Sequence, residues 1–206
     1  MMTYAQFKDY IARFLWREGD AGFAGDLDNL IKMGEARLNR DLRVQRMSRT
    51  QSATIQGGSI QVPDDYLEMR VITTDSHPSP LQYVSPFEME QIRVTNPSRF
   101  QPVYTIAGER FRFAGASADE GRTVVLTYYA KVPGFQNLGS SWLAEDHLDL
   151  YTYAVLRHTA SYLHDDARVA LWQNEYAETL ASVMDEETRK RYAGSPLVPR
   201  MPGIVA

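Results

Sequence analysis

The stretch TVVLTYYA, residues 123–130, decides the fold class, because it is the strongest strand signal in the sequence. Valine, threonine and tyrosine are enriched in strands, where branched and aromatic side chains pack well on a pleated surface. Shorter β-like segments precede it, and residues 103–106 and 110–113 flank Ala107-Gly108-Glu109, which is typical of a hairpin turn. We therefore expect a β-rich insertion over residues 50–133.

Helical spacing appears on the N-terminal side of this insertion, in residues 3–47. Thr3 and Gln6 form a capping box, and the apolar residues that follow recur every three or four positions. Gly19 is the expected left-handed end of the first helix. A second helix is expected from Gly25 to about Arg43.

The same spacing returns on the C-terminal side, in residues 141–192. Asp165-Asp166 interrupts it, which predicts two long helices that run antiparallel as a hairpin. The predicted fold class is α+β: a helical framework, consisting of an N-terminal helix pair and a long C-terminal antiparallel helical hairpin, with an inserted small antiparallel β module. We expect one domain over residues 1–194.

Composition narrows the function classes. The 206 residues carry 22 Lys+Arg and 26 Asp+Glu, a net charge of −4, and 44% are hydrophobic, which excludes a wholly disordered chain. The absence of cysteine excludes disulfides, cysteine-zinc sites, iron–sulfur clusters and thiol catalysis. Residues 1–15 contain Lys8, Asp9 and Arg13, so no signal peptide is expected. No apolar run approaches the ~20 residues of a membrane span, so no membrane partner is expected.

The sequence predicts no catalytic, metal or cofactor site, and hence no enzyme. His158 and His164 are six positions apart and so lie on different faces of a helix, and the aspartates after His164 are better explained by a turn. Asp75-Ser76-His77 contains the residue types of a catalytic triad, but triad members meet in space and not as neighbours in sequence. No phosphate-binding loop, dinucleotide fingerprint or nucleophile elbow is present.

Charge is distributed unevenly along the chain. Residues 37–49 hold five arginines at every third position against one acid, whereas residues 141–187 hold ten acids against two arginines. A spacing of three drifts about 60° per step round a helix, so the arginines wrap around the axis and do not line one DNA-reading face. They form either a solvated, salt-bridged helix end or the contact with the acidic hairpin of a neighbouring copy. The candidate interface arginines are Arg37, Arg40, Arg43, Arg46 and Arg49.

The acidic hairpin supplies candidate residues for the contact with the basic segment of a neighbouring copy. The candidate residues are Glu175, Glu178, Asp185 and Glu186.

Residues 195–206 differ from the rest, because proline recurs every third residue at Pro196, Pro199 and Pro202. Polyproline II has three residues per turn, so this segment is expected to be an extended C-terminal arm that docks on a partner, unless it is a frayed terminus. Its apolar candidates for an interface are Leu197, Val198, Met201 and Ile204.

Several segments, taken together in their order and spacing, resemble the head-to-tail adaptor (connector) proteins of tailed phages. They are GEARLNRDLR at 34–43, IQVPDDYLEMR at 60–70, YYAKVP at 128–133, WL at 142–143, DLYTYA at 149–154, YLHDD at 162–166 and WQ at 172–173. The resemblance covers about residues 4–190.

This resemblance implies a structural protein without catalytic residues or cofactors. Such proteins form a ring, typically of twelve copies, beneath the portal protein of the capsid. The ring extends the DNA channel without sequence-specific DNA binding and offers a docking surface for tail, nozzle or stopper proteins. In such a ring, the acidic residues of the hairpin are candidates for the channel lining, where they would repel DNA phosphates, or for a subunit interface. The apolar residues of the arm are candidates for a subunit or portal interface. The resemblance also implies a place in the virion, at the head–tail junction, after synthesis in the host cytoplasm. The alternative is a sequence-tolerant nucleic-acid-binding module that uses the arginines of residues 37–49 as a phosphate patch.

Overall fold

The computed structural model describes residues 2–75, 79–96, 102–115, 121–138, 141–163 and 166–193. These residues form two compact units, which we call the helical unit (the described residues of 2–44 and 133–193) and the β unit (the described residues of 45–132). The chain thus enters and leaves the β unit between two parts of the helical unit. The prediction of one domain over 1–194 stays a prediction, and the C-terminal arm 195–206 lies outside the described residues.

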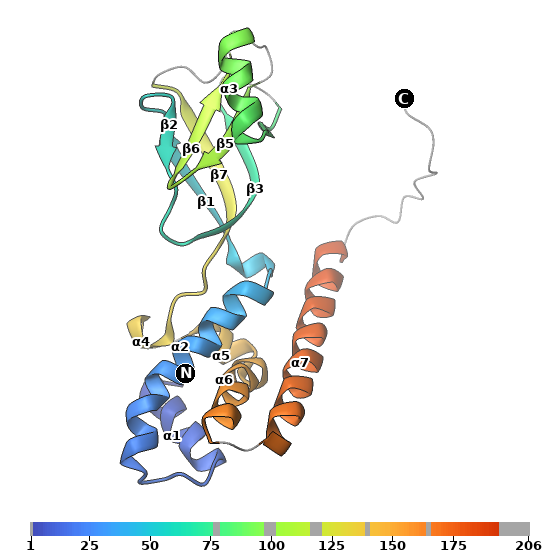
Figure 1. The fold of residues 1–206 in the computed structure, drawn as a ribbon. Coiled ribbons are helices and arrows are strands. Elements are labelled where there is room, and N and C mark those ends of the chain that lie inside the picture. The colour runs from blue at the N-terminus through green and yellow to red at the C-terminus, as the bar shows by residue number, and fades with distance from the viewer. Residues whose placement is uncertain are drawn as a thin grey trace. The chain divides into compact units, whose positions relative to one another are not determined.

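The helical unit begins with α1 (Tyr4–Phe14) and α2 (Ala21–Asp41) and resumes with α4 (Phe135–Leu138), α5 (Trp142–Asp146), α6 (Leu148–Tyr162) and α7 (Asp166–Tyr192) (Figure 1). The capping box of Thr3 and Gln6 is confirmed at the start of α1. Asp20 caps α2 by accepting the N–H of Phe23, so this helix starts earlier than Gly25. The helix end expected at Gly19 is wrong, because α1 already ends at Phe14.

Helix α6 lies at the centre of the helical unit. Its sequence places apolar side chains all round the helix, and a helix of this kind is stable only when it is covered on several sides. It packs against α2, α5 and α7, and at the crossing with α2 the position of Gly34 lets α2 approach closely. A Cβ at Gly34 would lie 3.0 Å from the carbonyl oxygen of Ala154 and 3.0 Å from Cγ2 of Val155. The fully buried residues of α6 include Leu150, Tyr151, Ala154, Val155, Leu156 and Ala160.

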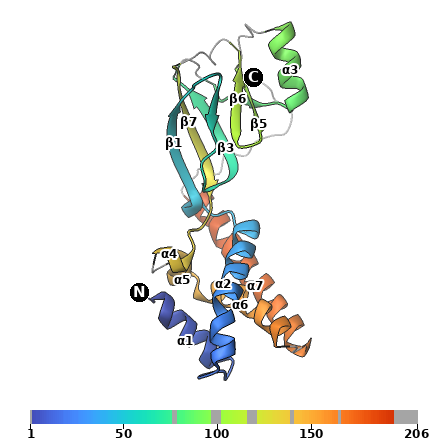
Figure 2. The ribbon, with the colours of Figure 1, turned by 60° about the vertical axis from the view of Figure 1, so that its left-hand side comes forward.

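The described part of the β unit contains two sheets and the helix α3 (Figure 2). The first sheet has the order β1 (Ser48–Thr54), β7 (Thr123–Ala130), β3 (Tyr66–Thr74); the second has the order β2 (Ser59–Gln61), β6 (Arg110–Ala114), β5 (Val103–Ala107), β4 (Gln82–Tyr83). One 3-10 turn, η1 (Gln45–Met47), precedes β1, and α3 (Pro86–Thr95) packs on β5 and β6.

The two sheets share one apolar core. β7 alternates half-buried and buried residues along its whole length, and Tyr128 from this strand and Phe111 from β6 are fully buried. The ring of Tyr66 lies between them, with centroids 5.3 Å from Phe111 and 5.8 Å from Tyr128. The strand predicted at residues 123–130 is thus the central strand of its sheet.

The predicted fold class is corrected by this architecture. The β part is not a small antiparallel module, since the described residues include seven strands in two sheets and β4 pairs with β5 in parallel. A long C-terminal hairpin does not dominate the helices either: α6 has 15 residues against 27 in α7, and it packs on α2 as well. The expectation failed because the apolar residues of α6 surround the helix, whereas a hairpin needs only one apolar face.

Candidate interface residues

Glu35 joins three segments of the helical unit. Its Oε1 accepts the backbone N–H of Phe135 at 2.6 Å and the hydroxyl hydrogen of Tyr151 at 2.6 Å. Burial, together with the charge of Glu35, raises the pKa of Tyr151 far above its ordinary value, so the tyrosine stays a donor. Within the segment 34–43, Gly34 and Glu35 therefore position α6 and the start of α4.

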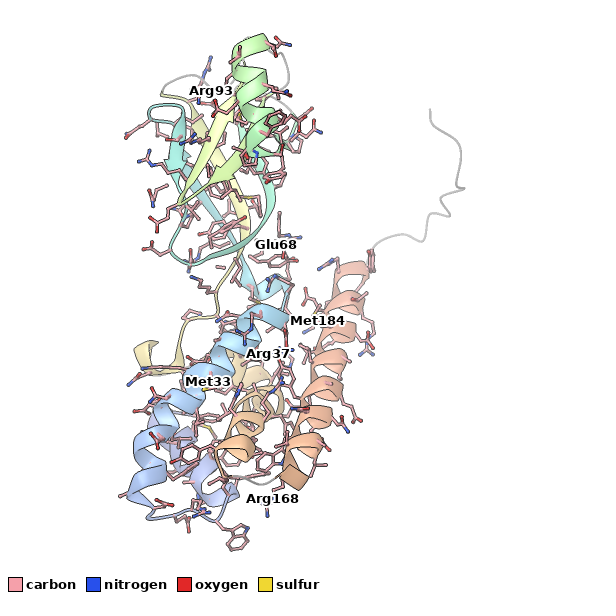
Figure 3. The ribbon with its side chains drawn as sticks, in the orientation of Figure 1. Met33, Arg37, Glu68, Arg93, Arg168 and Met184 are labelled. Carbon is pink, nitrogen blue, oxygen red and sulfur yellow. The ribbon has the colours of Figure 1, made fainter. Side chains whose placement is uncertain are left out.

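The first predicted interface arginine, Arg37, is bound inside its own subunit. Its Nε donates to Oδ2 of Asp41 at 2.5 Å, and the same oxygen accepts the hydroxyl hydrogen of Tyr176 at 3.0 Å. Burial and this carboxylate raise the pKa of Tyr176. Arg37 lies between α2 and α7 (Figure 3), so the contact connects these two helices.

A second arginine, on α6, also lies beside Tyr176. Arg157 lies with its guanidinium carbon 5.1 Å from the ring centroid of Tyr176. Burial lowers the pKa of His158, and the charges of Arg157, Arg40 and Arg37 lower it further, so all three arginines act on this histidine. We call Arg37, Arg40 and Arg157 the basic flank.

The remaining arginines of the predicted run do not join the basic flank. Arg43 donates to the carbonyl oxygens of Asn39 and Leu42, at 2.9 and 2.7 Å, and so provides hydrogen-bond donors to carbonyl groups at the end of α2. Arg46, in η1, and Arg49, in β1, belong to the β unit. Arg49 forms an ion pair with Asp65.

Asp65 also accepts a hydrogen bond from the hydroxyl of Tyr128, at 2.9 Å. Burial, with help from Asp65, raises the pKa of Tyr128 to about 12. The arginine run is thus divided between two units, and two of its five members are neutralised by aspartates.

The predicted acidic residues all lie on α7, but they are not equivalent. Glu178 and Asp185 are exposed, and Glu175 is close enough to Tyr153 to contribute to its raised pKa. Glu186 instead pairs with Lys190 at 2.6 Å, which lowers the pKa of Glu186. We call Glu175, Glu178 and Asp185 the acidic edge. It ends before the last turn, which carries Arg189, Lys190 and Arg191.

The described residues contain no group of three or more His, Asp or Glu side chains that could hold a metal ion. Nor do the helices in these ranges include one that is long and apolar enough to cross a membrane. His77, His164, Asp165 and the arm residues Leu197, Val198, Met201 and Ile204 lie outside the described residues.

Comparison with known proteins identifies the family. A family model described as SU10 adaptor protein matches residues 2–200, nearly the whole chain. The chain belongs to the SU10 adaptor protein family. This is a family of phage head-to-tail adaptors, as the resemblance predicted, so the adaptor is a structural component of a phage virion that works with portal and tail proteins. No curated protein matches the sequence.

Two features of this adaptor do not follow from the sequence patterns described above. The first is the pair of hydrogen bonds that Glu35 accepts, although a lone carboxylate within an apolar helical stripe is a signal for a buried hydrogen bond. The second is the left-handed backbone conformation of Trp16, although this residue directly follows the apolar stripe of the first helix, where glycine is the usual residue.

Proposed function

We propose that this adaptor assembles into a ring, with twelve copies as the expected number, beneath the portal. The ring extends the DNA channel, lets DNA pass without sequence-specific binding, and offers a docking surface to tail, nozzle or stopper proteins. The observation that carries the proposal is that the basic flank adjoins the face of α7 that carries Tyr176, through Arg37 and Arg157, whereas the acidic edge lies about 100° or more round the helix from that face. Family membership supports the adaptor role, and this charge arrangement supports the ring.

The positions on α7 follow from helix geometry. Tyr176 faces α2, because its hydroxyl is bound to Asp41. Glu175 is one residue earlier and so lies about 100° round the helix. Glu178 and Asp185 lie about 60° and 80° further round in the same sense, away from α2 and the basic flank. The two charged surfaces therefore point in different directions from one subunit.

Such a subunit attracts its own copies head to tail. The acidic edge of one copy can meet the basic flank of the next. The basic flank of the first copy and the acidic edge of the second then stay exposed, so each can bind a further copy. Contacts of this heterologous kind close into a ring when the rotation between copies divides a full turn. The pairs are partly exposed, so salt should weaken them.

A charge swap tests this contact. Arg40→Glu and Glu178→Lys should each shift the mass measured by light scattering from ring-sized towards monomeric, for the chain alone or mixed with the portal protein of the same phage. The double variant should recover the ring-sized mass, because the charges are again opposite. Gln173→Lys, on an exposed position of α7 outside the acidic edge, is the matched control.

Ring-sized assembly by both single variants would show that these surfaces do not meet. In that outcome the acidic edge is free to line the DNA channel, where carboxylates repel phosphates. The nucleic-acid-binding alternative predicts a different result, duplex DNA binding that falls by orders of magnitude over modest salt. The pairing of Arg37 and Arg49 with aspartates argues against it.

The C-terminal arm is proposed to contribute to portal or tail binding through Leu197, Val198, Met201 and Ile204. Deletion of residues 195–206 should leave the unfolding transition unchanged and abolish co-purification with the portal protein or the adjoining tail protein. Co-purification of the deleted chain at the parent level would assign the arm no binding role.

A further inference from the structure

The turn between α1 and α2 has a tryptophan where glycine is usual. The N–H of Trp16 donates to the carbonyl oxygen of Arg13 at 3.0 Å, and that of Arg17 donates to Ala12 at 2.9 Å. This pair of bonds defines a helix end whose next residue takes the left-handed conformation, for which glycine is strongly favoured. Trp16 has φ 56°, and it is the one non-glycine residue with positive φ among the described residues.

The side chain of Trp16 contributes little to the fold, because it is 90% exposed. An indole in solvent loses the hydrophobic stabilisation that burial would supply, and the left-handed backbone adds a local cost. Unfavourable local conformations occur preferentially at functional sites. Tryptophan is also among the residues that dominate binding energy at protein interfaces. These two observations on one residue therefore point to a binding role.

Two further aromatic side chains, Phe14 and Tyr162, are exposed at the same end of the helical unit. Tyr162, at the end of α6, donates a 2.6 Å hydrogen bond to Asp26 near the start of α2, which places the end of α6 beside the α1–α2 turn. Figures 1 and 2 show these helix ends together, and Arg168, at the start of α7, lies there in Figure 3. We call this surface the aromatic tip; its members are the exposed side chains of Phe14, Trp16 and Tyr162.

A groove of about 640 Å³ lies between α1 and α2 beside this turn, with Phe23 and Leu27 among its apolar lining. Its ionisable lining consists of three cations and three acids, so it has no net charge to attract a phosphate backbone. Those residues are Lys8, Asp9, Arg13, Arg17, Glu18 and Asp20.

The two arginines that flank Trp16 are only loosely paired. The closest atoms of Arg13 and Glu18 are 4.0 Å apart, and those of Arg17 and Asp20 are 3.5 Å apart. Both guanidinium groups are substantially exposed, and they are therefore available to carboxylates of a partner.

We propose that the aromatic tip docks a different protein of the head–tail junction, with Trp16 entering an apolar slot bordered by carboxylates. The inference rests on the proposed function, since it assigns the surface through which the ring meets a portal or tail protein. It is independent of the basic flank and the acidic edge.

Trp16→Gly separates binding from folding. Glycine suits the left-handed backbone, so the melting temperature should be no lower than that of the parent. The full-length chain is titrated with purified portal protein and with the purified adjoining tail protein of the same phage. We expect the affinity for one of them to fall at least about ten-fold, as for a residue that dominates an interface. Arg13→Glu should also weaken this binding, because it repels the bordering carboxylates.

Phe87→Ala is the matched control, because Phe87 is an aromatic side chain with 74% exposure in α3 of the β unit. It should bind both probes like the parent. Binding of both probes by Trp16→Gly within two-fold of the parent would overturn the docking surface and leave the proposed function intact. A parent chain that binds neither probe would overturn both. Binding of duplex DNA that is lost in Trp16→Gly would replace the protein partner by nucleic acid.

Discussion

Tyr151 on α6 and Glu35 on α2 are joined by a hydrogen bond of 2.6 Å from the tyrosine hydroxyl to Oε1 of the carboxylate. The same oxygen holds the backbone N–H of Phe135, where the chain returns from the β unit. The contact therefore connects three segments that are far apart in sequence.

Removing this hydroxyl should destabilise the helical unit. Tyr151→Phe leaves a carboxylate without one of its two donors in a partly buried place, which costs about 1.5–3 kcal/mol. Urea unfolding followed by circular dichroism measures the loss. Tyr192→Phe, at an exposed tyrosine of α7, should change the free energy of unfolding by less than about 0.5 kcal/mol. Equal values for the two variants would show that the hydrogen bond to Glu35 has no net effect on stability.

Gly34 and Gly25 on α2 should respond oppositely to larger side chains. Gly34→Leu places atoms against Ala154 and Val155, where even a Cβ is 3.0 Å from its neighbours, so overpacking should cost about 1–3 kcal/mol. At Gly25 a Cβ meets nothing within 4 Å, so Gly25→Ala should gain about 0.5–1 kcal/mol from helix propensity. Thermal unfolding of both variants checks the signs. A stable Gly34→Leu protein would mean that α2 and α6 can separate without cost.

Asp41 should control the docking of α7. Asp41→Ala removes the acceptor of Tyr176 and the partner of Arg37, so α7 loses its polar contact with α2. Amide hydrogen exchange in α7 should accelerate about ten-fold or more, which corresponds to about 1.4 kcal/mol or more. Gln173→Ala, at an exposed position of the same helix, should leave exchange at the parent rate. Unchanged exchange in both proteins would show that the contacts with α6 suffice to hold α7.

Alkaline pH should destabilise the β unit through Tyr128. The folded pKa of about 12 lies above the unfolded value of about 10, so the stabilising contribution is full below pH 10 and is lost as the pH rises to 12. Other tyrosines also titrate in this window, and therefore the comparison is with Tyr128→Phe. The free energy of unfolding should fall more steeply between pH 10 and 12 in the parent. Parallel curves would exclude a raised pKa at this residue.

Local sequence signals predicted individual elements better than their assembly. The capping box of Thr3, the strand at 123–130 and the hairpin turn at 107–109 each depend on neighbours within a few residues, and all three are confirmed. The central place of α6 depends on Gly34 and Glu35, more than a hundred positions away, so spacing within α6 could not distinguish a hairpin from a buried helix.

The predicted site residues show the same division. The even spacing of the arginines was visible in the sequence, but their partners were not, because Asp65 reaches Arg49 only after β1 and β7 have paired and Tyr128 has been buried. At Trp16, by contrast, a local signal gave the wrong prediction. The left-handed backbone conformation of Trp16 follows from the end of α1 at Phe14, whereas Gly19 predicted a later helix end.

The antiparallel pairing of β1 with β7 affects the entropic cost of bringing α2 and α6 together. Ser48 faces Tyr129 in this pair, so the two connections to the helical unit leave the β unit from adjacent strand ends. Until the β unit forms, α2 and α6 are separated by a long flexible loop whose closure costs entropy. Once it has formed, that loop is already closed, and α6 reaches Gly34 at lower cost. A formed β unit thus lowers the entropic cost of bringing α2 and α6 together, and replacement of residues 46–131 by a short linker should preserve the helical unit.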